Sequence, residues 1–124
     1  NNRSGAVRLP AAPPPARRIE HRVAGADANP YLLLATLLEA MRQGLDERDD
    51  PPPALIGNAY DPSTPDRGPQ LPTSMADALE LFADSAFAKE ALGDEMHRIL
   101  CAVKSTELAT FNAHVSDFER ATFV

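Results

Sequence analysis

Apolar positions alternate near the start of the chain and recur at helical spacing further on. Residues 6–9 alternate and are followed by Pro10, which predicts a short strand, and residues 17–23 are expected to form a second short strand. From residue 30 to about residue 45, apolar side chains recur every three or four positions, which predicts a helix with one face packed in a core. Asn29 is the expected cap of this helix, and Pro30 takes its first position. The packed face comprises Leu34, Leu37, Leu38, Met41 and Leu45.

The second half of the chain predicts a long loop and two further helical regions. Residues 48–73 are rich in proline and carry no periodic pattern, which is typical of either a functional loop or a surface excursion. Ser74 is the expected cap of a helix that pauses near residues 84–85 and ends at Gly93. A last helix is expected over residues 94–112, and no element is assigned to the remaining tail.

Two strands cannot satisfy their own edges, so they predict a larger sheet completed by other residues. We therefore expect an α/β (α+β) fold in which residues 1–124 are a mostly α-helical fragment with two short N-terminal strands. The absence of an initiating methionine also suggests a fragment. The longest apolar stretch, residues 31–38, is too short to span a bilayer, and the single cysteine, Cys101, is typical of a cytoplasmic protein.

Charge is distributed unevenly along the chain. Residues 1–22 carry a net charge of +4, whereas the remaining residues carry −10. A basic head on an acidic body predicts that the head binds an anion such as a nucleotide phosphate. A nucleic-acid partner is disfavoured because most of the surface is acidic and no aromatic residue precedes Tyr31.

The second predicted strand concentrates the candidate chemistry on one face. Alternation places Arg18, Glu20 and Arg22 together, and Arg3 and Arg8 on the preceding segment could join them. A carboxylate between guanidinium groups stays ionised and could bind Mg²⁺, while the guanidinium groups could hold phosphate or carboxylate. By itself, however, the pattern favours the solvated face of an edge strand with cross-strand ion pairs.

Other residues with reactive side chains predict structural roles. His21 faces away from Glu20 in the strand, which disfavours a metal role. Cys101 has apolar neighbours in the last helix and is expected to pack. His97 and His114 are too far apart to chelate one metal ion.

The order and spacing of several short motifs resemble the C-terminal signature of glutamine synthetases. The motifs are Asn-Arg-Ser (residues 2–4), Arg-Leu-Pro (8–10), Arg-Arg-Ile-Glu-His-Arg (17–22), Ala-Asn-Pro-Tyr-Leu (28–32) and Gly-Asn-Ala-Tyr (57–60). The resemblance covers essentially the whole chain. It implies that residues 1–124 are the C-terminal portion of a glutamine synthetase catalytic domain.

The resemblance also implies roles for individual residues. Glu20 would bind an active-site Mg²⁺ or Mn²⁺ ion, and Arg22 would contact the glutamate substrate and its phosphorylated intermediate. Arg3 would stabilise the transferring phosphoryl group, and Arg8 and Arg18 would lie near the phosphates of ATP. The implied reaction phosphorylates glutamate with ATP and then replaces the phosphate by a nitrogen nucleophile. The implied assembly is a homo-oligomer of two stacked rings, a dodecamer, with a tail around Phe118 and Phe123 docked on another subunit.

Departures from the common pattern bear on the nucleophile. Pro15 replaces a lysine that many bacterial members carry before the Arg-Ile-Glu string, and the residues after Arg22 are closer to the γ-glutamylpolyamine (γ-glutamylputrescine) branch. The acceptor is therefore ammonia or a polyamine, and the expected context is nitrogen metabolism, as glutamine biosynthesis or polyamine catabolism. Tyr60 takes the position of a regulatory tyrosine in some members, but its neighbours differ, so ordinary packing of its ring is expected.

The alternative to a ligase is a homologue that kept the fold as an anion-binding or scaffold protein without catalysis. The presence of Glu20 and of the candidate arginines favours the enzyme. The 124 residues alone are expected to be inactive, because most metal ligands and the adenine pocket would lie elsewhere.

Overall fold

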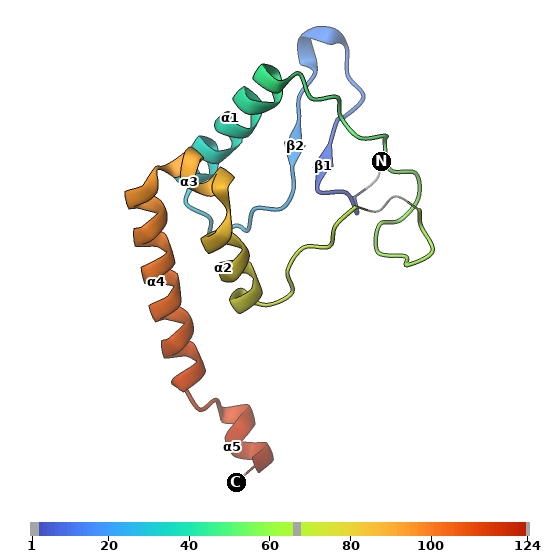
Figure 1. Ribbon diagram of the computed structural model, residues 1–124. Helices are drawn as coiled ribbons and strands as arrows, with labels where there is room; N and C mark the ends of the chain where they lie inside the picture. Colours follow the sequence, from blue (N-terminus) through green and yellow to red (C-terminus); the bar gives the residue numbers. More distant parts are fainter. Residues whose placement is uncertain (1–2, 66–67, 124) are drawn as a thin grey trace. The chain divides into compact units, whose positions relative to one another are not determined.

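The computed structural model describes residues 3–65 and 68–123, which are mostly helical with one pair of short strands (Figure 1). The chain forms two compact units, within Asn1–Gln70 and within Leu71–Val124. The fold class expected from the sequence is thus confirmed for this portion of the chain. Asn2, part of the first motif, lies outside the described residues.

The strands of the first unit are shorter than the alternating segments predicted. β1 spans Val7–Arg8 and β2 spans Glu20–His21, and they pair antiparallel with Val7 opposite His21 and Arg8 opposite Glu20. A 3₁₀ turn, η1 (Pro14–Ala16), lies in the connection between them. Prolines in this connection remove backbone donors, so regular pairing stops close to Arg8 and Glu20.

Helix α1 (Pro30–Glu47) begins as the sequence predicts. The Asn29 side chain accepts hydrogen bonds from the backbone N–H groups of Tyr31 (3.0 Å) and Leu32 (3.3 Å), and Pro30 follows at the first helical position. The helix ends at Arg48, whose φ of 55° is left-handed, and the N–H of Asp49 then bonds to the carbonyl of Gly44 at 3.0 Å.

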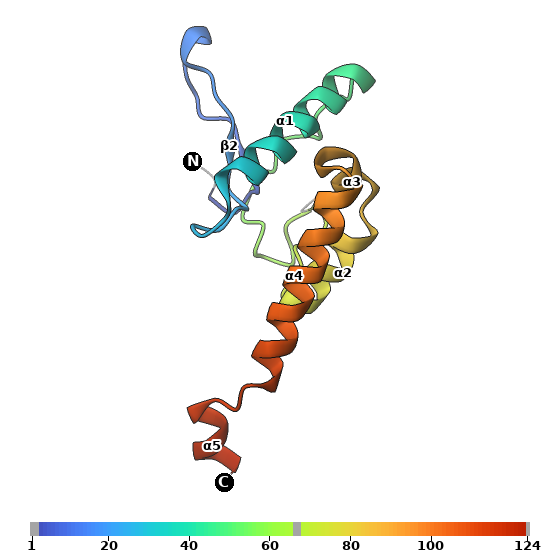
Figure 2. The ribbon, with the colours of Figure 1, turned by 90° about the vertical axis from the view of Figure 1, so that its left-hand side faces the viewer.

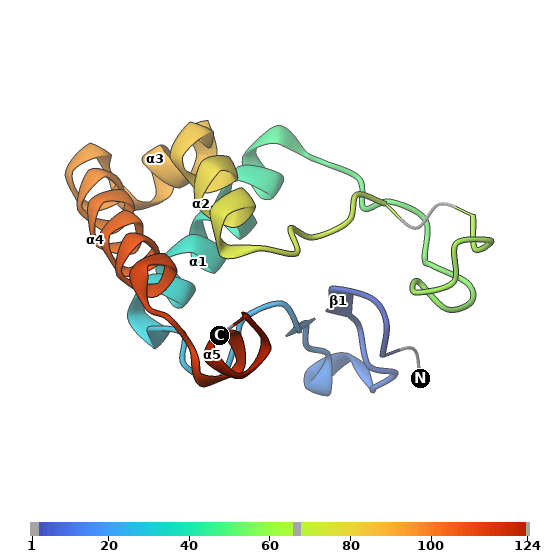
Figure 3. The same ribbon diagram turned by 90° about the horizontal axis from the view of Figure 1, so that it is seen from below.

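The second unit is a helical cluster formed by α2 (Met75–Asp84), α3 (Ala86–Leu92) and α4 (Asp94–Ala113), which lie side by side in Figure 3. Ser74 caps α2 through the N–H of Asp77 at 3.1 Å, as predicted. His97 in α4 is buried against α2: its ring stacks on Phe82 and its Nε2 lies 2.9 Å from the Phe82 carbonyl oxygen. Because a carbonyl only accepts, Nε2 is the protonated nitrogen of His97.

A fifth helix, α5 (Asp117–Phe123), was not predicted, and it lies beyond the C-terminal end of α4 (Figure 2). Ser116 and Glu119 form a reciprocal capping box at its start. The Glu119 carboxylate accepts from the Ser116 N–H (2.7 Å), and the Ser116 hydroxyl accepts from the Glu119 N–H (3.2 Å). The Ser-x-x-Glu pattern was the sequence signal that could have revealed this helix.

The apolar stripe of α1 does not pack in a core of the described residues, contrary to the sequence-based prediction. Leu34, Leu38, Met41 and Leu45 are all exposed, Leu45 to 78%. Across the described residues only Ala88 and His97 are buried, so a core able to cover this stripe has not formed. Helical spacing identifies the apolar face, but it does not say which residues cover that face. None of the helices in the described part is both long and apolar enough to cross a membrane.

Candidate functional site

A paired contact between a guanidinium group and a carboxylate lies at the centre of the β1–β2 pair. Arg8 Nε donates to Glu20 Oε2 at 2.8 Å, and Arg8 Nη2 donates to Glu20 Oε1 at 2.6 Å. The register that places these residues opposite each other makes this geometry possible. Both side chains are about a quarter exposed, so the pair is partly screened by solvent.

Two more arginines act on the same carboxylate. Arg22 Nη1 lies 4.0 Å from Glu20 Oε2, and the backbone N–H of Arg22 bonds to the Ala6 carbonyl oxygen at 2.9 Å. The hydrogen bonds from Arg8 are the largest cause that lowers the pKa of Glu20, and the charges of Arg8, Arg18 and Arg22 add to this effect against a smaller opposing effect of desolvation. The predicted face of Arg18, Glu20 and Arg22 is thus a cationic cluster around an ionised carboxylate.

A pocket of about 540 Å³ lies at the end of the strand pair nearer to Arg18. Its walls are residues 9–12 and 17–19, in the connection between β1 and β2. Most of this lining is apolar, and Arg17 and Arg18 supply its positive charge. Arg18 therefore belongs both to the pocket wall and to the charge cluster around Glu20.

Arg3 is the one candidate that lies outside this contact network. It is exposed and precedes Ser4, whose hydroxyl oxygen accepts a hydrogen bond from the Ala59 N–H at 2.8 Å. The sequence did not predict this hydrogen bond of Ser4, because no periodic pattern indicates a contact between residues 55 positions apart. The only signal was the presence of Ser4 and Ala59 in two separate motifs.

A hard divalent cation such as Mg²⁺ needs several oxygen ligands, and Glu20 offers one carboxylate. Within residues 3–65 and 68–123, His, Cys, Asp and Glu side chains nowhere gather in a group of three that could hold a metal ion. Glu20 can still supply one ligand, since a carboxylate has about four lone-pair positions and Arg8 uses two of them. His21 follows Glu20 in β2 and so lies on the opposite face.

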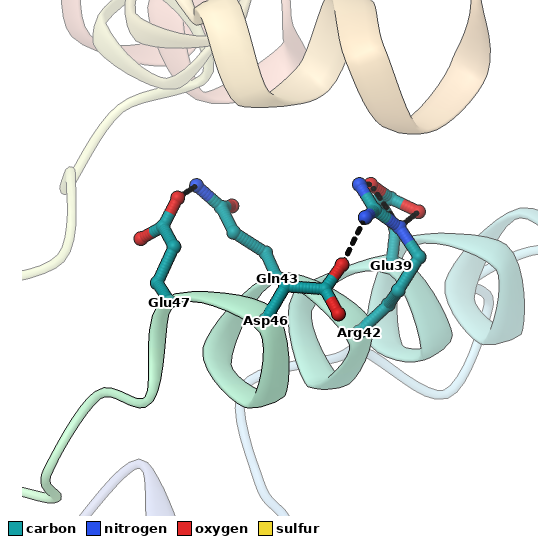
Figure 4. A network of polar contacts seen from close by, with 5 residues as sticks. All are labelled: Glu39, Arg42, Gln43, Asp46 and Glu47. Carbon is teal, nitrogen blue, oxygen red and sulfur yellow. Dashed lines mark hydrogen bonds and ion pairs between the residues drawn. The ribbon is translucent and has the colours of Figure 1, made fainter.

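Helix α1 carries a second carboxylate–arginine network (Figure 4). In this network, unlike the one around Glu20, no carboxylate is surrounded by several arginines. Arg42 Nε donates to Glu39 Oε2 at 2.9 Å, and Arg42 Nη1 donates to Asp46 Oδ2 at 2.6 Å. Here one arginine lies between two carboxylates, whereas at the strands one carboxylate lies among arginines. Arg42 lowers the pKa of Glu39, so both glutamates stay ionised, but only Glu20 has excess positive charge around it.

Tyr60 and Cys101 differ in how far their side chains are exposed. The Tyr60 side chain is 77% exposed, so the expected packing of its ring does not occur among the described residues. Cys101 is half-buried, with Sγ 3.9 Å from His97 Nε2, in agreement with a packing role.

The chain is similar in sequence to known proteins over most of its length. Residues 1–123 match the family model described as glutamine synthetase, catalytic domain. The chain is 39% identical to γ-glutamylethanolamide synthetase from Streptomyces coelicolor over 82% of the chain and 21% of that protein. It is 33% identical to γ-glutamylputrescine synthetase from Escherichia coli over 96% of the chain and 24% of that protein. A glutamine synthetase from Clostridium saccharobutylicum is 30% identical over 99% of the chain and 29% of its own length.

The chain thus spans between about a fifth and a third of the length of these relatives. The family match covers β1, β2 and all five α-helices, including the strands that carry Arg8 and Glu20 and the residue Arg22 that follows β2. Each of the three relatives is named as a synthetase. The chain therefore belongs to the glutamine synthetase family.

Proposed function

We propose that residues 1–124 are the C-terminal portion of a glutamine synthetase catalytic domain, and that the full-length protein is an ATP-dependent γ-glutamyl ligase. The observation that carries this proposal is the cluster of Arg8, Arg18 and Arg22 around the ionised carboxylate of Glu20. A surface that combines one carboxylate with several guanidinium groups suits a reaction in which phosphoryl and carboxylate groups meet.

The proposed reaction has two steps. The γ-carboxylate of glutamate attacks the terminal phosphorus of ATP, and ADP leaves as γ-glutamyl phosphate forms. A nitrogen nucleophile then attacks the γ-carbonyl carbon, loses a proton and displaces phosphate. Both steps move negative charge, so fixed positive groups lower their barriers.

Positions along residues 18–22, the segment that contains β2, suggest how the substrates share the site. Arg18 and Arg22 are four residues apart, so their Cα atoms are at most about 14 Å apart. We assign Arg18 and Arg8 to the phosphates of ATP, on the side of the pocket, and Arg22 to glutamate at the other end. We assign Arg3 to the phosphoryl group in transfer, which requires its exposed side chain to turn toward the cluster.

Glu20 would hold one divalent cation, Mg²⁺ or Mn²⁺, together with ligands from the rest of the protein. Such a cation supplies positive charge beside the phosphates. The contribution of this chain is to keep the Glu20 carboxylate ionised and oriented, through the two hydrogen bonds from Arg8. The remaining lone-pair positions of Glu20 are those available to a cation.

We propose an organic amine as the nitrogen nucleophile. Two of the three relatives reported above are named for products with ethanolamine and putrescine, and the residues that follow Arg22 resemble the polyamine branch. We further propose a homo-oligomer of stacked rings in which α5 docks on another subunit. The exposure of Phe118 and Phe123, 75% and 79%, supports such a docking role.

Phosphate release by the full-length protein tests the proposal. ATP, Mg²⁺ and glutamate would be supplied with ammonia, ethanolamine or putrescine in parallel. We expect turnover that depends on glutamate and is greater with an amine than with ammonia. Greater turnover with ammonia would make the protein a glutamine synthetase in the strict sense. A folded oligomer without turnover on any acceptor would contradict the proposal and favour an anion-binding homologue.

A further inference from the structure

A side-chain hydrogen bond attaches a distant loop to the strand segment that carries the site. The Ser4 hydroxyl oxygen accepts from the Ala59 N–H at 2.8 Å, and Ser4 is half-buried. These residues are 55 positions apart, and helix α1 lies between them in the sequence. The contact therefore fixes the position of a loop that local sequence does not place.

The attached loop, residues 57–64, is braced by its own hydrogen bonds. The Asn58 carbonyl oxygen accepts from the Asp61 N–H (3.0 Å) and from the Thr64 hydroxyl (2.7 Å), and Asp61 Oδ1 accepts from the Ser63 N–H (2.9 Å). Gly57 starts the loop with a φ of 105°, which few other residues adopt. A loop already ordered in this way needs only an attachment point to act as a rigid wall.

The attachment point lies at a defined end of the site. Ser4 is two residues before Ala6, whose carbonyl oxygen binds the Arg22 N–H at 2.9 Å, so the Cα atoms of Ser4 and Ala6 are within about 7 Å. Further along the paired strands lies the Arg8–Glu20 pair, and the pocket lies beyond it. The loop is thus attached at the Arg22 end of the cluster, and the pocket is at the Arg18 end.

We propose that Ser4 is a positioning residue that holds the loop of residues 57–64 as a wall beside Arg22. This inference rests on the proposed function, because it assigns that end of the site to glutamate and the amine. Loss of the Ser4 hydroxyl should therefore weaken the binding of glutamate and of the amine. The binding of ATP, at the opposite end, should stay nearly unchanged.

The test compares Ser4→Ala, Ser4→Thr and the control Ser105→Ala in the full-length protein. Ser105 is an exposed serine of α4 outside the site. Backbone hydrogen exchange of the peptide that spans the loop is expected to become about fivefold to tenfold faster in Ser4→Ala, as loss of one hydrogen bond implies. KM for glutamate and for the amine should rise by about the same factor, while KM for ATP changes less than about twofold. Ser4→Thr keeps the hydroxyl and should restore both values, and Ser105→Ala should change neither.

Exchange that stays slow in Ser4→Ala would overturn the attachment. Faster exchange with equal changes in all three KM values would overturn the assignment to the Arg22 end. If the unmodified protein shows no turnover, the proposed function fails and the positioning role fails with it, whereas the exchange measurement still decides whether Ser4 holds the loop.

Discussion

At the scale of single residues, the Arg8–Glu20 pair determines the charge state of the candidate site. Two hydrogen bonds from one guanidinium group fix both carboxylate oxygens, and Arg18 and Arg22 add positive charge. The pKa of Glu20 is therefore lower in the folded chain than its ordinary value of 4.5. Glu20 stays ionised throughout the physiological pH range, which the proposed role as a cation ligand requires.

The same shift predicts a pH-dependent contribution to stability. Because the pKa of Glu20 is lowered by folding, its ionised form stabilises the fold above pH 4.5, and this contribution is lost as the pH falls through the lowered pKa. Thermal unfolding of the full-length protein and of Glu20→Gln, from about pH 7 to about pH 3, measures this effect. We expect the difference between the two to be constant near neutrality and to shrink in acid. A difference that persists unchanged at the acid limit would contradict the account.

The sequence placed Glu20 among arginines but did not identify its main partner. Alternation within one segment puts Arg18 and Arg22 on the face of Glu20, and this follows from backbone geometry alone. The bond to Arg8 depends on strand register, which is set by the proline-rich connection and has no local signature. The Arg8–Glu20 contact is a cross-strand ion pair of the kind that the pattern alone favoured.

At the scale of elements, capping residues were the most informative signals. Asn29 and Ser74 cap α1 and α2 as predicted, and Ser85 caps α3 through the Ala88 N–H at 3.1 Å. The predicted strands of residues 6–9 and 17–23 were longer than β1 and β2. The spacing of side chains indicates which residues share a face, whereas the length of a strand depends on the strands that pair with it.

Gly93 joins α3 to α4 in a conformation that other residues rarely adopt. Its φ of 75° and ψ of 153° lie in a region almost restricted to glycine, and no atom within 4 Å would meet an added Cβ. Gly93→Ala should therefore lower stability through backbone strain alone, by about 1–3 kcal/mol.

The control for this prediction is Gly44→Ala, the same substitution inside α1. Nothing lies within 4 Å of an added Cβ there either, and the backbone is helical, so stability should rise by roughly 0.5–1 kcal/mol. The thermal unfolding midpoints of the two variants should move in opposite directions. A decrease for both would show that the space around these glycines, rather than Gly93 backbone strain, sets the outcome.

At the scale of the whole molecule, the described chain buries very little. Ala88 and His97 are the buried residues among those described, and large apolar side chains remain exposed along α1, α4 and α5. Large apolar side chains gathered on exposed helix faces are typical of surfaces that other protein covers. This supports the proposal that residues 1–124 are one portion of a larger domain, and it explains why the sequence alone predicted a packed stripe that the chain does not cover.

Residues 1–124 produced alone should show no release of phosphate from ATP with glutamate and any amine. Glu20 is the single metal ligand that we assign here, and a charge cluster without a complete cation site cannot support the transfer. The isolated chain should also unfold with low cooperativity, because its core is small. The assay is turnover beside a thermal melt. Turnover by the isolated chain would contradict the assignment.

The most direct test of the central claim is the activity of Glu20→Gln beside Glu39→Gln in the full-length protein. Both glutamates are ionised and bonded to arginine, but only Glu20 lies within the cationic cluster. Phosphate release with ATP, Mg²⁺, glutamate and the preferred amine should fall by roughly a hundredfold or more in Glu20→Gln. It should change by less than about twofold in Glu39→Gln, since a surface pair contributes little. Equal and small effects of the two substitutions would contradict the claim that the cluster around Glu20 is the catalytic site.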